Sequence, residues 1–183
     1  MVSGPSGVGK STITREVLRR TGATFSISAT TRRPREGEVD GREYVFVGDA
    51  AFQRMIDGGE LLEWAEVFGR RYGTPRRAVD EALASGRTVV LEIDVQGALQ
   101  VHRRMPAATF VLIAPPDGEE LTRRLVARGS EDAASAAKRR AKADEEIRTA
   151  EQSGVYKYRV VNDDLETAVR QVVDIIKQEP ANP

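Results

Sequence analysis

Residues 4–11 read Gly4-Pro5-Ser6-Gly7-Val8-Gly9-Lys10-Ser11, the most specific pattern in the chain. It matches the pattern G-x-x-x-x-G-K-[S/T], whose glycines allow successive backbone N–H groups to turn inward around phosphate oxygens. A full match arises by chance in roughly one unrelated chain of this length in a hundred. A chance glycine turn ahead of a helix is therefore the weaker interpretation. The stretch predicts a loop that binds the phosphates of a nucleotide.

The loop is followed by the groups that phosphate and metal binding require. It opens a predicted helix over residues 11–20, whose N-terminus adds positive potential where phosphates would lie. Lys10 is placed to bridge the β- and γ-phosphates, and the Ser11 hydroxyl to bind Mg²⁺. The apolar run 88–93 ends in Glu92-Ile93-Asp94, which supplies the acidic partner that would hold water on the metal. Carboxylates at strand ends also cap helices, but beside this loop the metal role is favoured.

Short apolar runs alternate with helical patterns along the rest of the chain. We predict buried strands at 25–27, 88–93, 109–113 and 158–161, and helices at 11–20, 75–85, 97–104 and 165–177. Only three residues precede the loop, so the first strand is expected to be very short. The alternation predicts an α/β fold around a parallel sheet. Two stretches break it: an Arg-rich segment with shorter β-like runs over about 29–72, and an Ala-rich, charged helical stretch over about 128–150.

Composition narrows the classes of function. The chain has 28 basic and 28 acidic residues and no cysteine. Proteins that hold nucleic acid through its phosphates usually carry a basic excess, so no nucleic-acid partner is expected. The absence of cysteine excludes disulfides and thiolate chemistry. No apolar run approaches the ~20 residues of a membrane span, and no signal peptide precedes the loop, so a cytoplasmic protein without a membrane partner is predicted.

At this point the sequence resembles guanylate kinases, almost from end to end. The segments that carry the resemblance are Ser3 to Gly7, Ser26 to Arg35, Gly37 to Gly41, Tyr44, Leu62 to Ala65, Tyr72 to Thr74, Glu92 to Gly97, Ile113 to Pro116, Arg128-Gly129 and Val161 to Asp164. The resemblance implies one domain over residues 1–183, with a P-loop NTPase-type parallel sheet flanked by helices. Its core would be 1–27, 81–119 and 151–183. A GMP-binding insertion would be 28–80 and a helical lid 120–150, which is where the two irregular stretches lie.

The same resemblance implies roles for individual residues. Catalytic roles would fall to Lys10, Arg124, Arg128 and Arg139. ATP would be bound by Gly4, Pro5, Ser6, Gly7, Val8, Gly9, Lys10, Ser11, Thr12 and Asn162, and GMP by Ser28, Arg32, Arg35, Tyr44, Glu63, Thr74 and Asp94. Mg²⁺ would be held by Ser11 and, through water, by Glu92. A shift of one position, to Arg33, Arg123 or Arg140, stays open for the arginines, and Asn162 could instead belong to the cap of the last helix.

The chemistry of guanine fits these residues. Guanine presents N1–H and an amino group as adjacent donors and O6 as an acceptor, so Glu63 can accept from both donors and Asp94 from the amino group. A hydroxyl at Thr74 can donate to O6. Adenine would place an acceptor against a carboxylate, and a site built from polar groups can discriminate by ~10⁴ or more. For Thr74, which precedes Pro75, capping of the next helix is the competing interpretation.

The resemblance therefore implies Mg²⁺-assisted phosphoryl transfer from ATP to GMP, and also to dGMP, giving GDP or dGDP. Two other classes remain as alternatives. One is a non-catalytic guanylate-kinase-like module that binds phosphorylated peptides, which the intact Gly9, Lys10 and Ser11 disfavour. The other is a related kinase with another acceptor, such as a phosphorylated sugar or a different nucleotide.

Overall fold

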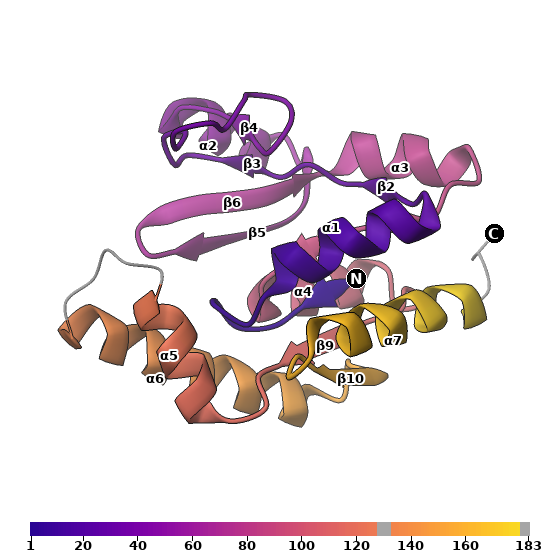
Figure 1. The fold of residues 1–183 in the computed structure, drawn as a ribbon. Helices are drawn as coiled ribbons and strands as arrows, with labels where there is room; N and C mark the ends of the chain where they lie inside the picture. The colour runs from indigo at the N-terminus through magenta and orange to yellow at the C-terminus, as the bar shows by residue number, and fades with distance from the viewer. Residues whose placement is uncertain (128–132, 180–183) are drawn as a thin grey trace.

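A computed structural model describes residues 1–127 and 133–179 of the chain. Its central sheet has the order β10-β9-β1-β8, and every neighbouring pair is parallel. The four strands are β10 (Tyr158–Val161), β9 (Val111–Ala114), β1 (Val2–Ser3) and β8 (Glu92–Ile93). β1, short as expected, occupies the centre, so the loop that follows it leaves the middle of the sheet (Figure 1). The predicted α/β fold with a parallel sheet is confirmed.

The strand predicted over residues 88–93 is divided in two. β7 (Val89–Val90) pairs in parallel with β2 (Thr24–Phe25), whereas β8 pairs with β1. Leu91 lies between them, and its carbonyl accepts the Val2 N–H at 2.9 Å. One extended stretch therefore passes from one partner strand to another, which a continuous apolar run does not reveal.

Helices cover the sheet and enclose two main clusters of buried side chains. α1 (Lys10–Thr21) and α7 (Leu165–Gln178) lie side by side (Figure 1) and pack through aliphatic residues. Their cluster with the sheet includes Val2, Val8, Ile13, Val17, Val111, Ile113, Val160, Val169 and Val172. α3 (Arg76–Ala84) and α4 (Val95–Arg104) contribute to a second cluster of Leu62, Val79, Leu91, Ile93, Ala98, Val101 and Phe110.

The Arg-rich irregular stretch forms a small mixed sheet of its own. Its order is β4-β3-β6-β5, formed by β3 (Ala29–Thr30), β4 (Val45–Phe46), β5 (Leu61–Val67) and β6 (Arg70–Pro75). β5 and β6 form an antiparallel hairpin, and α2 (Asp49–Asp57) packs its buried Phe52 against Ala29 and Leu61. This sheet adjoins the central one through contacts of β5 with α4.

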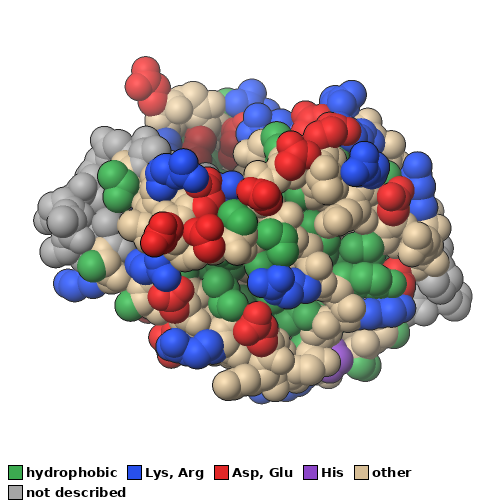
Figure 2. Space-filling model, turned by 60° about the horizontal axis from the view of Figure 1, so that its bottom comes forward, with side chains coloured by type: hydrophobic (Ala, Val, Ile, Leu, Met, Phe, Trp, Pro, Cys, Tyr) green, Lys and Arg blue, Asp and Glu red, His purple; other side chains and the backbone are tan. Residues whose placement is uncertain are grey.

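Two helices form the second irregular region, α5 (Gly118–Ala127) and α6 (Ala133–Ser153). They pack on each other through Leu121, Leu125 and Ala143, and α6 also contacts α4. Among the described residues, no helix combines the length and apolar character needed to cross a membrane. Figure 2 shows basic and acidic side chains interspersed over one face of the molecule, in keeping with their equal numbers in the sequence.

Candidate active site

The phosphate loop is fixed in shape by contacts that only glycine permits. A Cβ added to Gly4 would lie 2.2 Å from the carbonyl oxygen of Ile113, in the neighbouring strand β9. Gly9 precedes α1 with φ of 97°, and a Cβ there would lie 2.4 Å from Nδ2 of Asn162. The predicted loop is therefore present between β1 and α1, with its glycines where the backbone approaches other groups closely.

Lys10 and Asn162 hold this loop from two sides. The Lys10 ammonium donates to the carbonyls of Gly4 at 2.6 Å and Pro5 at 2.9 Å, so its charge lies over the loop. The buried Asn162 amide donates to the carbonyl of Val8 at 2.7 Å. The run 162–164 does cap the last helix, but through Asp164, whose carboxylate accepts from the N–H of Thr167; Asn162 itself has no part in the cap. Asn162 instead fixes the middle of the loop.

The two residues predicted to hold Mg²⁺, Ser11 and Glu92, meet at the first turn of α1. Ser11 Oγ donates to Glu92 Oε1 at 2.6 Å, although the two residues are far apart in sequence. A serine hydroxyl and a carboxylate are hard oxygen donors, and Mg²⁺ in nucleotide sites usually takes one or two such protein groups together with water and phosphate oxygens. The residues present thus fit Mg²⁺ beside the loop.

The predicted guanine-binding carboxylate is buried. Glu63 and Thr74 face each other across β5 and β6, and Thr74 Oγ1 donates to Glu63 Oε1 at 2.6 Å. Pro75 is the N-cap of α3, and no side chain caps that helix, so the capping interpretation of Thr74 is wrong. Burial raises the pKa of Glu63 to about 7, and the charge of Asp94 adds to the rise, while the Thr74 hydrogen bond opposes it.

Asp94 and Gly97 lie beside this pair at the start of α4. The Asp94 carboxylate caps the helix by accepting the N–H of Gly97 at 2.7 Å, as the capping interpretation expects. A Cβ added to Gly97 would lie 2.4 Å from Glu63 Oε2 and 3.3 Å from Asp94 Oδ1. Glu63, Thr74, Asp94 and Gly97 therefore lie close together. Sequence reasoning did not single out Gly97, although it follows Asp94 by three residues.

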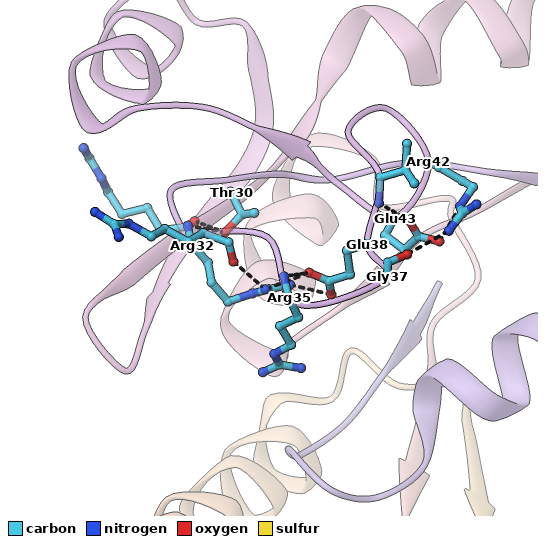
Figure 3. A network of polar contacts seen from close by, with 10 residues as sticks. Thr30, Arg32, Arg35, Gly37, Glu38, Arg42 and Glu43 are labelled. Atoms are coloured by element: carbon cyan, nitrogen blue, oxygen red, sulfur yellow. Dashed lines mark hydrogen bonds and ion pairs between the residues drawn. The ribbon is translucent and has the colours of Figure 1, made fainter. Parts of the chain in front are cut away.

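Residues 31–44, the arginine loop between β3 and β4, are organised by one carboxylate, that of Glu38 (Figure 3). The Arg32 guanidinium donates to both oxygens of Glu38 at 2.9 Å, and the backbone N–H of Arg35 donates to Glu38 at 2.7 Å. Arg32 holds the pKa of Glu38 below its usual range, and its guanidinium lies 5.2 Å from the ring centroid of Tyr44. The exposed Arg35 side chain points away from this network (Figure 3).

Two further members of the predicted GMP set lie on the same small sheet. The half-buried Ser28 accepts the N–H of Val45 through its carbonyl at 3.0 Å. Tyr44 is half-buried, and burial raises the pKa of its phenol, with the nearby charge of Glu92 adding to the effect. Tyr44 is therefore close to Arg32 and within reach of the charge of Glu92.

The predicted lid arginines differ in their surroundings. Arg124 donates to Glu120 at 2.6 Å and reaches the carbonyl of Val8 at 3.5 Å, so α5 contacts the phosphate loop. Arg139 on α6 lies 5.0 Å from the ring centroid of Phe68. Arg140 instead pairs with Asp144 and donates to Gly118 and Thr122 of α5. Arg128 lies outside the described residues.

Two site-facing groups were not predicted. Glu146 on α6 has its pKa raised by burial, and the charges of Lys10 and Asp94 act on it, so it lies near both of these residues. Tyr156 donates to Ser3 Oγ at 2.9 Å, and burial raises its pKa to about 12. Nothing in the charged run Asp144-Glu145-Glu146 marks which carboxylate turns inward.

A glycine loop leaving the central strand of a parallel sheet, with a serine–carboxylate pair beside it, defines a P-loop nucleotide-binding protein. A family model described as guanylate kinase matches residues 1–179. A guanylate kinase of Synechocystis is 47% identical over 98% of this chain and 93% of its own length, and one of Symbiobacterium thermophilum is 48% identical over 99% and 85%. The chain belongs to the guanylate kinase family.

Solved structures agree with this assignment. The crystal structure of a guanylate kinase from Anaplasma phagocytophilum superposes with a TM-score of 0.80 at 33% identity, covering 98% of this chain and 85% of that one. A shikimate kinase from Bacteroides thetaiotaomicron has a TM-score of 0.52 at 14% identity and covers 96% of each chain, a likeness of fold alone. The resemblance seen in the sequence is confirmed.

Proposed function

We propose that this chain catalyses transfer of the γ-phosphoryl group of ATP to GMP, giving ADP and GDP, and that it also accepts dGMP. The observation that carries the proposal is the pairing of two sites within one fold. The phosphate loop presents Lys10 and the Ser11–Glu92 pair, and the buried Glu63–Thr74 pair presents acceptors and a hydroxyl to a purine edge. Membership of the guanylate kinase family supports GMP as the acceptor.

In this proposal the three parts of the chain have separate tasks. Residues 1–27, 81–119 and 151–183 form the core that holds ATP, residues 28–80 bind GMP, and residues 120–150 act as a lid. Within the ATP site the backbone N–H groups of the loop from Gly4 to Gly9 surround the phosphates, with Thr12 of α1 beside them. Asn162 supports ATP by fixing the Val8 carbonyl.

Mg²⁺, held by Ser11 and through water by Glu92, would supply positive charge to the phosphate oxygens. An oxygen of the GMP 5′-phosphate forms the new bond to the γ-phosphorus while the bond from that phosphorus to the bridging oxygen breaks, leaving its electron pair on ADP. The attacking oxygen is already anionic, so no strong general base is needed. The chain's own residues therefore act by positioning and by charge: Lys10, Arg124 and Arg139 near the transferred group, with Arg128 assigned by the resemblance alone.

GMP is held at both ends. Glu63 accepts from N1–H and the amino group of guanine, Asp94 accepts from the amino group, and Thr74 turns its hydroxyl from Glu63 to O6. Arg35, whose side chain points away from the Glu38 network, Arg32 and Tyr44 bind the phosphate, with Ser28 close to the base. Because Glu38 already engages the Arg32 fork, that guanidinium is held in place before the nucleotide arrives.

The test is an assay of ADP release with GMP, dGMP, AMP, CMP, UMP and ribose phosphates offered in turn. We expect turnover with GMP and dGMP only, and its loss by orders of magnitude in Lys10→Ala, which also controls for contaminating kinases. Turnover with a different acceptor would replace the proposed substrate. Binding without turnover, for any acceptor, would support the non-catalytic module.

A further inference from the structure

The turn at the tip of the β5–β6 hairpin contains an unexpected residue. Val67 pairs with Arg70, which leaves Phe68 and Gly69 as a two-residue turn. Both have positive φ, 51° for Phe68 and 70° for Gly69, and Phe68 is the only non-glycine residue with positive φ in the part of the chain that the structure describes. Turns with two positive φ values strongly favour Asn-Gly, and a bulky side chain is unfavourable there. Turn geometry alone does not account for phenylalanine.

The ring of Phe68 contacts two basic residues of α6. Although the residue is 51% exposed, the Arg139 guanidinium and the Lys142 ammonium each lie 5.0 Å from its centroid. Arg139 and Lys142 are three positions apart in α6, so they share one face of the helix. Cations at this distance over an aromatic ring are attracted by its quadrupole. In Figure 1 the closed end of the hairpin lies near the α5–α6 pair.

Each side of this contact carries a separate part of the proposed site. The hairpin bears Glu63 and Thr74, one on each strand, whereas α6 bears Arg139 and the inward-facing Glu146. The two strands pair without a break from Glu63–Thr74 to Val67–Arg70, so a displacement at Glu63 is carried toward the tip of the hairpin. The Phe68 ring thus links the proposed guanine-binding strands β5 and β6 to Arg139 on α6.

We propose that Phe68 is a positioning residue that couples GMP binding to the placement of Arg139 over the ATP phosphates. The proposal rests on the proposed function, because it assigns GMP to the hairpin and ATP to the loop. The ring holds the Arg139 guanidinium, GMP fixes the hairpin that carries the ring, and ATP therefore binds more tightly to the protein that already holds GMP. By thermodynamic linkage ATP strengthens GMP binding by the same factor.

Replacement of Phe68 by asparagine separates this role from a structural one. Asparagine suits the left-handed backbone of the turn but has no aromatic ring. If Phe68 served only the turn, Phe68→Asn would keep or improve both stability and activity. If the ring couples the two sites, the variant is as stable as the wild type or more so, and less active. Phe68→Trp is the matched control, because it keeps an aromatic face for the two cations at the same backbone strain.

The experiment measures the affinity for a non-hydrolysable ATP analogue with and without GMP, together with kcat and the midpoint of thermal unfolding. One exposed cation–π contact corresponds to roughly a 2- to 5-fold effect, so two contacts predict a loss of kcat of roughly tenfold in Phe68→Asn. The enhancement of analogue binding by GMP should fall toward 1, while the affinity for GMP alone changes less than about 2-fold. Phe68→Trp should retain most of the enhancement, and Lys142→Met, which removes one cation, should lose part of it.

Two kinds of failure are distinguishable. If the wild type phosphorylates GMP and Phe68→Asn matches it in kcat and in the enhancement, the coupling role is wrong and the proposed function stands. Equal losses in Phe68→Asn and Phe68→Trp would also refute the ring as the cause. If the wild type does not phosphorylate GMP at all, the proposed function fails, and this proposal fails with it.

Discussion

Replacing Glu63 with glutamine should stabilise the protein without nucleotide, and should do so more at alkaline than at acidic pH. The carboxyl has an ordinary pKa of 4.5 in the unfolded chain and a pKa of about 7 when folded, raised mainly by burial. Between these values the unfolded chain loses a proton that the folded protein keeps. The free energy of unfolding therefore falls as pH rises from 4.5 to 7 and is constant above that range with respect to this group.

The magnitude follows from the size of the shift. A difference of about 2.5 in pKa corresponds to about 3 kcal/mol of destabilisation once Glu63 is ionised in both states. At pH 5.5 part of this loss is already present, so the advantage of Glu63→Gln over the wild type should grow by about 2 kcal/mol between pH 5.5 and 8.5. Glutamine keeps an acceptor for the Thr74 hydroxyl, so that hydrogen bond can remain.

Urea unfolding of both proteins at the two pH values measures this difference. Glu66→Gln is the matched control, because Glu66 is an exposed carboxylate in the same strand, and its replacement should alter stability little at either pH. A stability difference between Glu63→Gln and the wild type that is the same at pH 5.5 and 8.5 would refute the raised pKa.

The same variant should bind GMP far more weakly than the wild type while its affinity for ATP is nearly unchanged, and equal losses for both nucleotides would place the guanine site elsewhere.

Three further outcomes are expected. Guanosine, which lacks a titrating phosphate, should bind the wild type about tenfold more weakly for each pH unit below 7, because guanine needs the ionised Glu63 and its binding must expel the proton. Calorimetry measures this affinity, and the affinity of Glu63→Gln should not depend on pH in this way. Gly97→Ala should raise the KM for GMP at least about tenfold without changing that for ATP, since its Cβ would lie 2.4 Å from Glu63 Oε2; steady-state kinetics with each substrate varied would contradict this if both KM values rose together. Asn162→Ala should lower the free energy of unfolding by about 1–2 kcal/mol and raise the KM for ATP, because the Val8 carbonyl loses its buried donor; unchanged urea unfolding would argue against that support.

The phosphate loop was predictable because its information is local. Eight consecutive residues specify the backbone turn, the lysine and the serine, and strand β8 brings the Glu92 carboxylate to 2.6 Å from the Ser11 hydroxyl. The parallel sheet followed from the alternation of apolar and helical segments for the same reason. The division of residues 88–93 between two partner strands was not predictable, since no turn or break residue separates β7 from β8.

Side-chain contacts between distant segments are where the sequence alone was insufficient. Thr74 before Pro75 looks like a helix cap, but the antiparallel pairing places it opposite Glu63, whose buried carboxylate accepts a hydrogen bond from the Thr74 hydroxyl. Asn162 borders a helix cap, and only the approach of its strand to Val8 gives the amide its partner. Glu146 belongs to a run of charges on a polar helix, and the packing of α6 on α4 decides which of them is buried.

The β5–β6 hairpin departs twice from what stability alone would select. Glutamine at position 63 would avoid an ionised carboxylate in a buried position, and asparagine at position 68 would suit the turn, yet the chain has glutamate and phenylalanine. Violations of this kind are expected where function opposes stability. The phosphate loop shows no such conflict, because its positive φ angles fall on glycines. It follows that substitutions in the hairpin, more than those in the phosphate loop, should increase the stability of the protein. The two gains should come with different losses: Glu63→Gln should lose affinity for GMP, and Phe68→Asn should lose the coupling between GMP and ATP.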